Sequence, residues 1–236
     1  MLTSHKRVQQ QWKLLTEIIN MKDIAIFGAG GFGREVLTLI NDINKNNTCV
    51  WNIVGFYDDG KRKGESVNGY PVLGGVEELN SIDSPLSIVI AIGSPYAKEK
   101  IVCKINNSSI DYPTIIHPNV LIGDSNSVTI GKGCIICAGN IITTNSHIGD
   151  FVILNLSCTV GHDTVIENYC AFMPTCNISG EVKIGAGTYF GTGAKIINQK
   201  NIGKNSIIGA GAVVIRDVPD NAVVAGVPAK VININK

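Results

Sequence analysis

The sequence predicts a small α/β domain followed by a parallel β-helix. One observation is a run of fifteen consecutive six-residue repeats in the C-terminal half, each opened by an aliphatic residue or Phe. A short fixed period of this kind is typical of a parallel β-helix, in which each repeat forms one short strand and a turn. The other observation is a glycine-rich turn at residues 28–33, between an apolar run and a helical pattern, which is typical of an α/β unit.

The repeat openers share an apolar side chain and a spacing of six residues. They are Ile130, Ile136, Ile142, Ile148, Leu154, Val160, Ile166, Phe172, Ile178, Ile184, Phe190, Ile196, Ile202, Ile208 and Val214. The residue two before each next opener points to the same side of the strand, the interior, because side chains alternate along a strand. Cys134, Cys158, Cys170 and Cys176 hold this inward position, so we expect them to be small core residues.

A second interpretation of Cys134 is that it forms half of a metal site, or a redox pair, with Cys137. The chain has no second CxxC pair, and no His stands at the spacing that would complete a four-ligand zinc site. We therefore expect core packing at this pair and no metal.

The glycine turn follows an apolar run at residues 24–27 and precedes a helical pattern, after which a second apolar run ends at Asp58 and Asp59. This order of elements predicts a small Rossmann-like domain. Its glycines would let backbone amides approach a phosphate at the helix N-terminus, and the acidic pair could accept hydrogen bonds from a ribose or a base. We favour a nucleotide-linked ligand over a purely structural turn. NAD is a further alternative, although a second mononucleotide-binding half is missing.

Charged residues make up 17% of the chain and the net charge is +1. We therefore expect no nucleic-acid partner and no strong attraction to acidic membranes. No apolar run approaches the length of a transmembrane helix, so we expect no integral membrane segment. The seven Cys are an odd number and no secretory leader precedes them, which favours the reducing cytoplasm.

Residues 1–20 are predicted to form an amphipathic helix, with apolar residues such as Trp12 and Leu15 at helical spacing. The segment lacks the apolar region and the cleavage site of a signal peptide. It could be a packing helix or a weak contact to a membrane or a partner. The sequence also leaves open whether Met1 or Met21 is the natural start.

His162 is the candidate catalytic residue among the four His. It lies two residues after a repeat opener, at a turn of the predicted β-helix, so its side chain should project outward. Asp163 follows it directly and could orient the imidazole and raise its basicity. His5, His117 and His147 have no acidic neighbour, and we expect them to be structural or solvated.

Four features in this order resemble a known family: the glycine turn with its flanks at residues 27–35, the hexapeptide run, the Gly-His-Asp triplet at residues 161–163, and the ending at residues 225–230. Together they resemble the bacterial nucleotide-amino-sugar N-acetyltransferase and sialic acid O-acetyltransferase family, over residues 22–232. The resemblance implies a left-handed parallel β-helix, against the usual right-handed crossover rule. It also implies a homotrimer with acetyl-CoA in the groove between neighbouring subunits.

The same resemblance divides the chain into three segments. Residues 1–20 would be an N-terminal helical extension and residues 21–112 a Rossmann-like nucleotide-sugar-binding domain. Residues 113–236 would be the left-handed β-helix acetyltransferase domain.

The resemblance also implies roles for single residues, with His162 as the catalytic base and Asp163 as the acidic residue that enhances it. The positions implied to hold the nucleotide part of the sugar substrate are Gly30, Gly31, Phe32, Asp58, Asp59 and Gly93. Those implied to line the acetyl-CoA groove are Ala171, Gly180, Thr192 and Ala210. Ala171 departs from the family pattern, since some members place a second His there. This departure puts a two-His mechanism in doubt and leaves the oxyanion contact to backbone amides.

The implied reaction is direct transfer of an acetyl group from acetyl-CoA to the amine of a nucleotide-linked 4-amino-4,6-dideoxy sugar, a precursor of glycan or capsule. O-acetylation of sialic acid or another sugar hydroxyl is the alternative, and a non-catalytic scaffold that binds sugar nucleotides is the third. A Cys nucleophile would compete with the His base, but Cys137 is the one repeat thiol not assigned to the interior. The sequence does not determine whether the nucleotide is UDP, GDP or CMP, nor the stereochemistry of the sugar.

Overall fold

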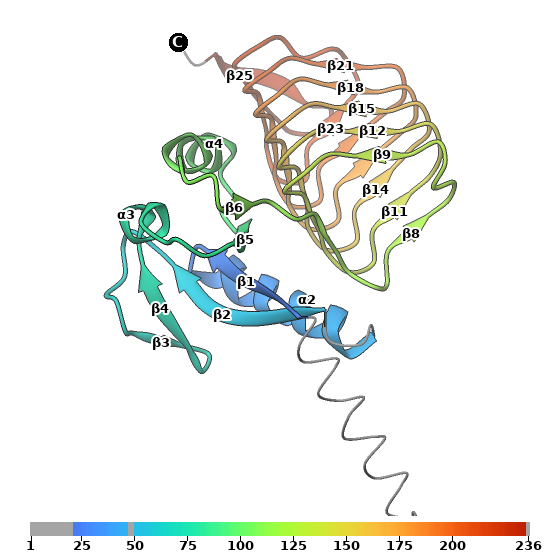
Figure 1. Ribbon diagram of the computed structural model, residues 1–236. Helices are drawn as coiled ribbons and strands as arrows, with labels where there is room; N and C mark the ends of the chain where they lie inside the picture. The colour runs from blue at the N-terminus through green and yellow to red at the C-terminus, as the bar shows by residue number, and fades with distance from the viewer. Residues whose placement is uncertain (1–20, 47–49, 235–236) are drawn as a thin grey trace, which may run out of the picture.

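The structure is a computed structural model that describes residues 21–46 and 50–234. The helix expected within residues 1–20 lies outside the described residues. Figure 1 shows an α/β region beside a stack of short-stranded coils. Within the described ranges, no helix combines the length and the apolar character that crossing a membrane requires.

The α/β region is a six-stranded sheet with the order β3-β4-β2-β1-β5-β6. Its elements are β1 (Lys22–Phe27), α2 (Gly31–Asn46), β2 (Trp51–Tyr57), β3 (Ser66–Val67), β4 (Tyr70–Gly74), α3 (Val76–Asn80), β5 (Leu86–Ile90), α4 (Pro95–Lys104) and β6 (Ile110–Asp111). Strand β1 pairs in parallel with β2 on one side and with β5 on the other. The order therefore reverses beside β1, and ligands of open α/β sheets bind at the carboxyl ends of the strands at such a point.

The β-helix is built from two-residue strands. They are β7 (Ile115–Ile116), β8 (Leu121–Ile122), β9 (Thr129–Ile130), β10 (Ile135–Ile136), β11 (Ile141–Ile142), β12 (His147–Ile148), β13 (Ile153–Leu154), β14 (Thr159–Val160), β15 (Val165–Ile166), β16 (Ala171–Phe172), β17 (Asn177–Ile178), β18 (Lys183–Ile184), β19 (Tyr189–Phe190), β20 (Lys195–Ile196), β21 (Asn201–Ile202), β22 (Ile207–Ile208) and β23 (Val213–Val214). Every third strand pairs in parallel, so one coil holds three repeats and Thr159 lies beside Asn177, eighteen residues on. The longer β24 (Ala222–Ala225) and β25 (Lys230–Ile234) form an antiparallel pair at the end.

The coils carry three sheets, which we call the first, second and third. The first comprises β7, β10, β13, β16, β19, β22, β24 and β25, the second comprises β8, β11, β14, β17, β20 and β23, and the third comprises β9, β12, β15, β18 and β21. The repeat openers fill the interior, where Phe172 and Phe190 stack with ring centroids 4.7 Å apart. The inward position predicted for Cys134, Cys158, Cys170 and Cys176 is confirmed, because all four are fully buried.

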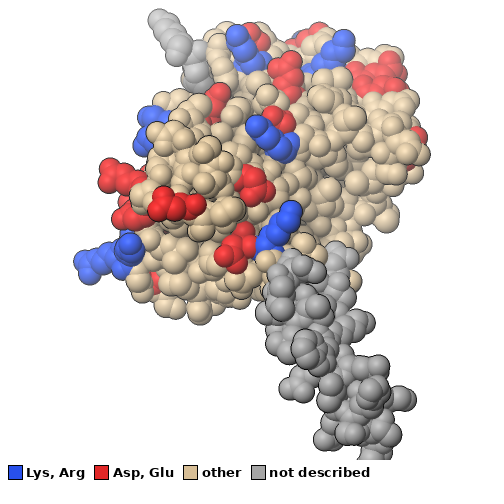
Figure 2. Space-filling model, viewed as in Figure 1, with Lys and Arg blue, Asp and Glu red and all other residues tan. Residues whose placement is uncertain are grey.

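The outer face of the first sheet joins the two regions. Ile115, Ile135 and Ile153 point out of the coil and are nevertheless almost fully buried, because they share one apolar cluster with β1 and α2. The α/β region is therefore fixed against one face of the β-helix. On the face seen in Figure 2, acidic and basic side chains are interspersed between wide uncharged areas.

Candidate active site

His162 and Asp163 form a hydrogen-bonded pair at the turn between β14 and β15. The imidazole Nδ1 lies 2.7 Å from Asp163 Oδ2, and the two side chains are 55% and 51% exposed. An ionised carboxylate can only accept, so in the neutral imidazole Nδ1 carries the proton and Nε2 presents its lone pair. The predicted outward projection of His162 is confirmed, and the pair has the geometry of a general base with its orienting acid.

Gly180 lies directly against the His162 ring. A Cβ built on Gly180 would lie 2.5 Å from Nε2, 2.6 Å from Cε1 and 2.8 Å from Cδ2 of the imidazole. Gly180 occupies the same corner as His162 one coil later, and only a residue without a side chain leaves room for the ring in this position. The sequence suggested Gly180 as part of an acetyl-CoA groove; the structure gives it a contact with the candidate base.

Asp163 is held in its charged form by its neighbours. Its pKa is lowered from the ordinary value, first by the hydrogen bond with His162 and then by a side-chain hydrogen bond with Asn145. Asn145 and Asp163 both have left-handed backbones, with φ of 53° and 56°, and they lie at the same corner one coil apart. Sequence reasoning missed Asn145. The eighteen-residue coil length was the signal that could have found it.

The glycines of the turn divide into two kinds. A Cβ on Gly28 would lie 2.8 Å from the Ala91 carbonyl oxygen, and one on Gly33 would lie 1.8 Å from that of Gly28, so both are required by packing. Gly30 and Gly31 are exposed, and a Cβ on either would meet nothing within 4 Å. The space beside these two, at the start of the sixteen-residue helix α2, is open to a ligand.

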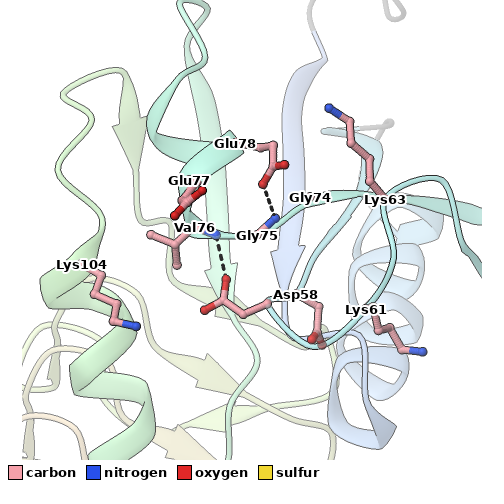
Figure 3. A pocket seen from close by; sticks show the side chains of 10 residues that line it. Asp58, Lys61, Lys63, Gly74, Gly75, Val76, Glu77, Glu78 and Lys104 are labelled. Atoms are coloured by element: carbon pink, nitrogen blue, oxygen red, sulfur yellow. Dashed lines mark hydrogen bonds between the residues drawn. The ribbon is translucent and has the colours of Figure 1, made fainter.

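The carboxylates of Asp58 and Asp59 are engaged by backbone amides. Asp58 Oδ2 accepts from Ala29 N at 2.8 Å and so holds the glycine turn, while Asp59 Oδ1 accepts from Val76 N at 2.8 Å. Both residues line a cavity of about 600 Å³ shown in Figure 3, between the loop after β2 and the start of α3. Each carboxylate keeps lone pairs for further hydrogen bonds, because two oxygens offer about four acceptor positions.

Gly93 lines a larger cavity of about 790 Å³ between the α/β region and the first sheet. One wall is the start of α4, and the other is formed by β-helix residues that include Met173 and Tyr189. A Cβ on Gly93 would reach 3.9 Å from Met173 Cε. Of the other residues implied for the nucleotide sugar, Phe32 is half-buried and packs against the cluster that joins the two regions.

Of the residues implied for acetyl-CoA, three lie at corners of the β-helix and one is buried. Thr192 and Ala210 are exposed at the corner that leads into the second sheet, and Gly180 lies at the corner that leaves it. The outer face of the second sheet, with Asn177 and Lys195, separates the two corners. Ala171 is different, since it is fully buried in β16 within the cluster that joins the two regions.

Comparison with known proteins connects both regions to enzymes. The family profile "PglD N-terminal domain" matches residues 23–105. GDP-perosamine N-acetyltransferase from Escherichia coli O157:H7 is 34% identical over 186 residues, which are 79% of this chain and 82% of that protein.

Two solved structures extend the likeness to 89% and 90% of the chain. A histidine-to-asparagine variant of perosamine N-acetyltransferase from Caulobacter crescentus, in complex with CoA and GDP-perosamine, has a TM-score of 0.81 at 29% identity and covers 89% of this chain and 97% of that one. The acetyltransferase domain of PglB from Neisseria gonorrhoeae FA1090, in complex with acetyl coenzyme A, has a TM-score of 0.79 at 32% identity and covers 90% and 100%. The coil accordingly matches a left-handed β-helix, as the family resemblance implied.

Proposed function

This chain is an acetyltransferase of the left-handed β-helix family of bacterial nucleotide-amino-sugar N-acetyltransferases, and we propose that it acetylates the amine of a nucleotide-linked 4-amino-4,6-dideoxy sugar. The observation that carries the proposal is the His162–Asp163 pair, held at an outer corner of the coil over Gly180. Acetyl-CoA supplies the activated acetyl group as a thioester.

His162 is the proposed general base. With Nδ1 committed to Asp163, Nε2 takes a proton from the substrate amine as the nitrogen attacks the thioester carbonyl. Base assistance of this kind contributes about a hundredfold to ten-thousandfold in rate. A backbone amide, rather than a second His, stabilises the oxyanion, because the position where some relatives carry that His is the buried Ala171. The acetyl group passes directly to nitrogen with no acyl-enzyme: the C–S bond of the tetrahedral adduct breaks, and CoA leaves as a thiolate that takes the proton from Nε2 of His162. Cys137 is too buried to act as a nucleophile.

The nucleotide sugar is proposed to bind between the glycine turn and the β-helix. The open space at Gly30 and Gly31 suits a phosphate at the start of α2, and the cavity at Gly93 borders the β-helix. Asp58 and Asp59 are near enough to the turn to contribute acceptors to the ribose or base. GDP-perosamine is the first acceptor to test, since relatives of similar architecture carry that name or were solved with it.

We also propose a homotrimer in which the site is completed between subunits. His162 lies at the corner between the second and third sheets, whereas the cavity of about 790 Å³ opens on the first sheet of the same chain. A neighbouring copy can bring its His162 to that cavity. Leu121 and Ile141, neighbours on the second sheet, are 63% and 43% exposed, and an apolar stripe of this kind suits a contact between subunits.

Residues 21–112 and 113–236 remain our proposed nucleotide-sugar and acetyltransferase domains. We propose the cytoplasm as the location, which suits the free thiols of the described cysteines.

The acetyl acceptor is tested with one purified sample and a panel of substrates. Acetyl-CoA is supplied with GDP-perosamine, with UDP- and CMP-linked amino sugars, and with free sialic acid, and release of CoA is measured after correction for hydrolysis. We expect turnover with an amino-sugar nucleotide and at least a hundredfold loss in His162→Asn. Transfer to sialic acid alone would replace the proposal by O-acetylation. Equal CoA release with and without acceptors would leave a binding scaffold.

A further inference from the structure

Lys98 is a lysine enclosed at the contact between α4 and the β-helix. It is 1% exposed, which places it among the largest fully buried side chains of the described residues. Within those residues its ammonium has one hydrogen-bond partner, the carbonyl oxygen of Cys170, at 3.4 Å. A lysine has three N–H donors, and 3.4 Å is long for a hydrogen bond, so the group is poorly compensated for the loss of water.

Among the residues that the structure describes, none forms an ion pair with Lys98. The titratable groups that interact with its charge are the thiols of Cys170 and Cys134, and burial raises their pKa values to about 12 and about 11, so both stay neutral. Asp150 acts on the Cys134 thiol and Glu167 on the Cys170 thiol, yet no ion pair among the described residues joins either carboxylate to Lys98. On α4 itself the charged neighbours are Glu99, Lys100 and Lys104, all exposed.

Burial is the main cause that lowers the pKa of Lys98 from 10.5 to about 7. A free α4 would expose the amine and return its pKa to the ordinary value, so the free state binds the proton more tightly. The docked state therefore gains stability as pH rises from about 7 towards 10.5, and that gain is absent below 7. Between pH 6 and pH 8 the linkage corresponds to about a tenfold change in the docking equilibrium.

The position of Lys98 connects this equilibrium to the proposed acceptor site. Ser94, Pro95 and Tyr96, in the turn before and at the start of α4, line the cavity of about 790 Å³. The opposite wall includes Met173, three residues after Cys170. The Lys98–Cys170 contact therefore joins the two walls of the cavity: Lys98 lies within one helical turn of the cavity residues on α4, and Cys170 lies three residues from the cavity residue Met173.

We propose that Lys98 is a pH-dependent positioning residue: its neutral amine docks α4 on the β-helix and so sets the acceptor cavity, and its protonation loosens that wall. The link to the acceptor rests on the proposed function, whereas the docking itself does not.

The docking is tested by amide hydrogen exchange of α4 at pH 6 and pH 8, corrected for intrinsic exchange. Lys98→Met keeps an unbranched side chain, one atom shorter, and removes the charge. Lys100→Met removes an exposed charge from the same helix as the matched control. We expect the protection of α4 to rise about tenfold from pH 6 to pH 8 in the parent and in Lys100→Met, and to be independent of pH and at least as high in Lys98→Met. The same rise in Lys98→Met as in the parent would overturn the proposal. Lys98→Leu serves as a second variant if Lys98→Met is poorly folded.

The link to the acceptor is tested by kinetics on the same three proteins. For each protein we take the ratio of a kinetic constant at pH 6 to its value at pH 8. The ratio for the nucleotide-sugar KM should be up to tenfold larger in the parent than in Lys98→Met, whereas the ratios for kcat and for the acetyl-CoA KM should be equal in the two proteins. Equal acceptor KM ratios would remove the link to the cavity. Absence of acetyl transfer in all three proteins would instead reject the proposed function, and the exchange data would still decide the role of Lys98.

Discussion

Gly180→Ala should inactivate the enzyme by moving the catalytic imidazole while leaving the fold intact. The added methyl group would lie 2.5 Å from Nε2 of His162, whereas atoms in ordinary contact are about 3.5 Å apart. The ring must therefore retreat by about 1 Å. A misplacement of that size costs about a hundredfold in rate, or about 2.7 kcal/mol of transition-state stabilisation.

Stability should change little in this variant. His162 is 55% exposed, so its ring can swing outward without disturbing the core. Gly180 is also not among the glycines with a left-handed backbone, so alanine fits its conformation. We expect a change of less than about 1 kcal/mol in the free energy of unfolding.

The assay is steady-state kinetics with acetyl-CoA varied up to saturation, together with a thermal unfolding midpoint. His162→Ala provides the control through a double-mutant cycle: if Gly180→Ala acts through the imidazole, it should have almost no further effect when the imidazole is absent. If Gly180 served only to bind acetyl-CoA, Gly180→Ala would raise the KM for acetyl-CoA and leave kcat unchanged. It would do so equally in the parent and in His162→Ala. That result, or a kcat within threefold of the parent, would refute the reasoning.

Three further predictions concern the nucleotide turn, the cofactor face and the acid of the catalytic pair. Gly31→Ala should leave the free energy of unfolding unchanged and raise the KM for the nucleotide sugar about tenfold, whereas Gly33→Ala should lower the free energy of unfolding by about 3 kcal/mol, because its Cβ meets a carbonyl oxygen at 1.8 Å. Thermal unfolding and kinetics on both variants separate the two glycines. Arg216 lies three coils beyond His162 at the same corner, about 14 Å away, where its charge is expected to contact the phosphates of acetyl-CoA. Arg216→Ala should therefore raise the KM for acetyl-CoA several-fold at constant kcat, and an unchanged KM would exclude that contact. Asn145→Gly retains the left-handed backbone but removes the amide that lowers the pKa of Asp163, so NMR titration should find that pKa shifted upward and kinetics should find kcat reduced about fivefold. A Gln199→Gly control, three coils beyond Asn145 at the same corner, should alter neither.

The β-helix and its candidate base could be predicted from the sequence because they depend on local period. Counting in sixes assigns an interior position to Cys158 and an outer turn to His162, and the structure agrees with both. Each assignment needs only the alternation of side chains along a strand and the length of a repeat. The glycine turn was recognised in the same way, from the order of a strand, a turn and a helix.

The features that the sequence did not give depend on contacts between distant segments. Ile135 and Ile153 point outward from their strands and are buried because they share an apolar cluster with residues of β1 and α2. Lys98 is separated by 72 residues from the carbonyl oxygen that it contacts. In a helix pattern it reads as one more exposed lysine, since the pattern contains no information about the coil that packs against α4.

Residues at intermediate separation could have been found with one further step, the conversion of the six-residue repeat into an eighteen-residue coil. Eighteen residues after His162 stands Gly180, and eighteen before Asp163 stands Asn145, so both partners of the pair follow from the coil length alone. The physical reason is that coils stack in register, so a bulky ring at a corner needs a neighbour that yields space, and a carboxylate there needs a neighbour that donates. A histidine followed after one coil by any residue with a Cβ could not rest against the next coil as His162 does. The spacing from His162 to Gly180 is therefore a stronger sequence criterion for this site than the Gly-His-Asp triplet, because the triplet specifies the chemical groups and the glycine permits their geometry.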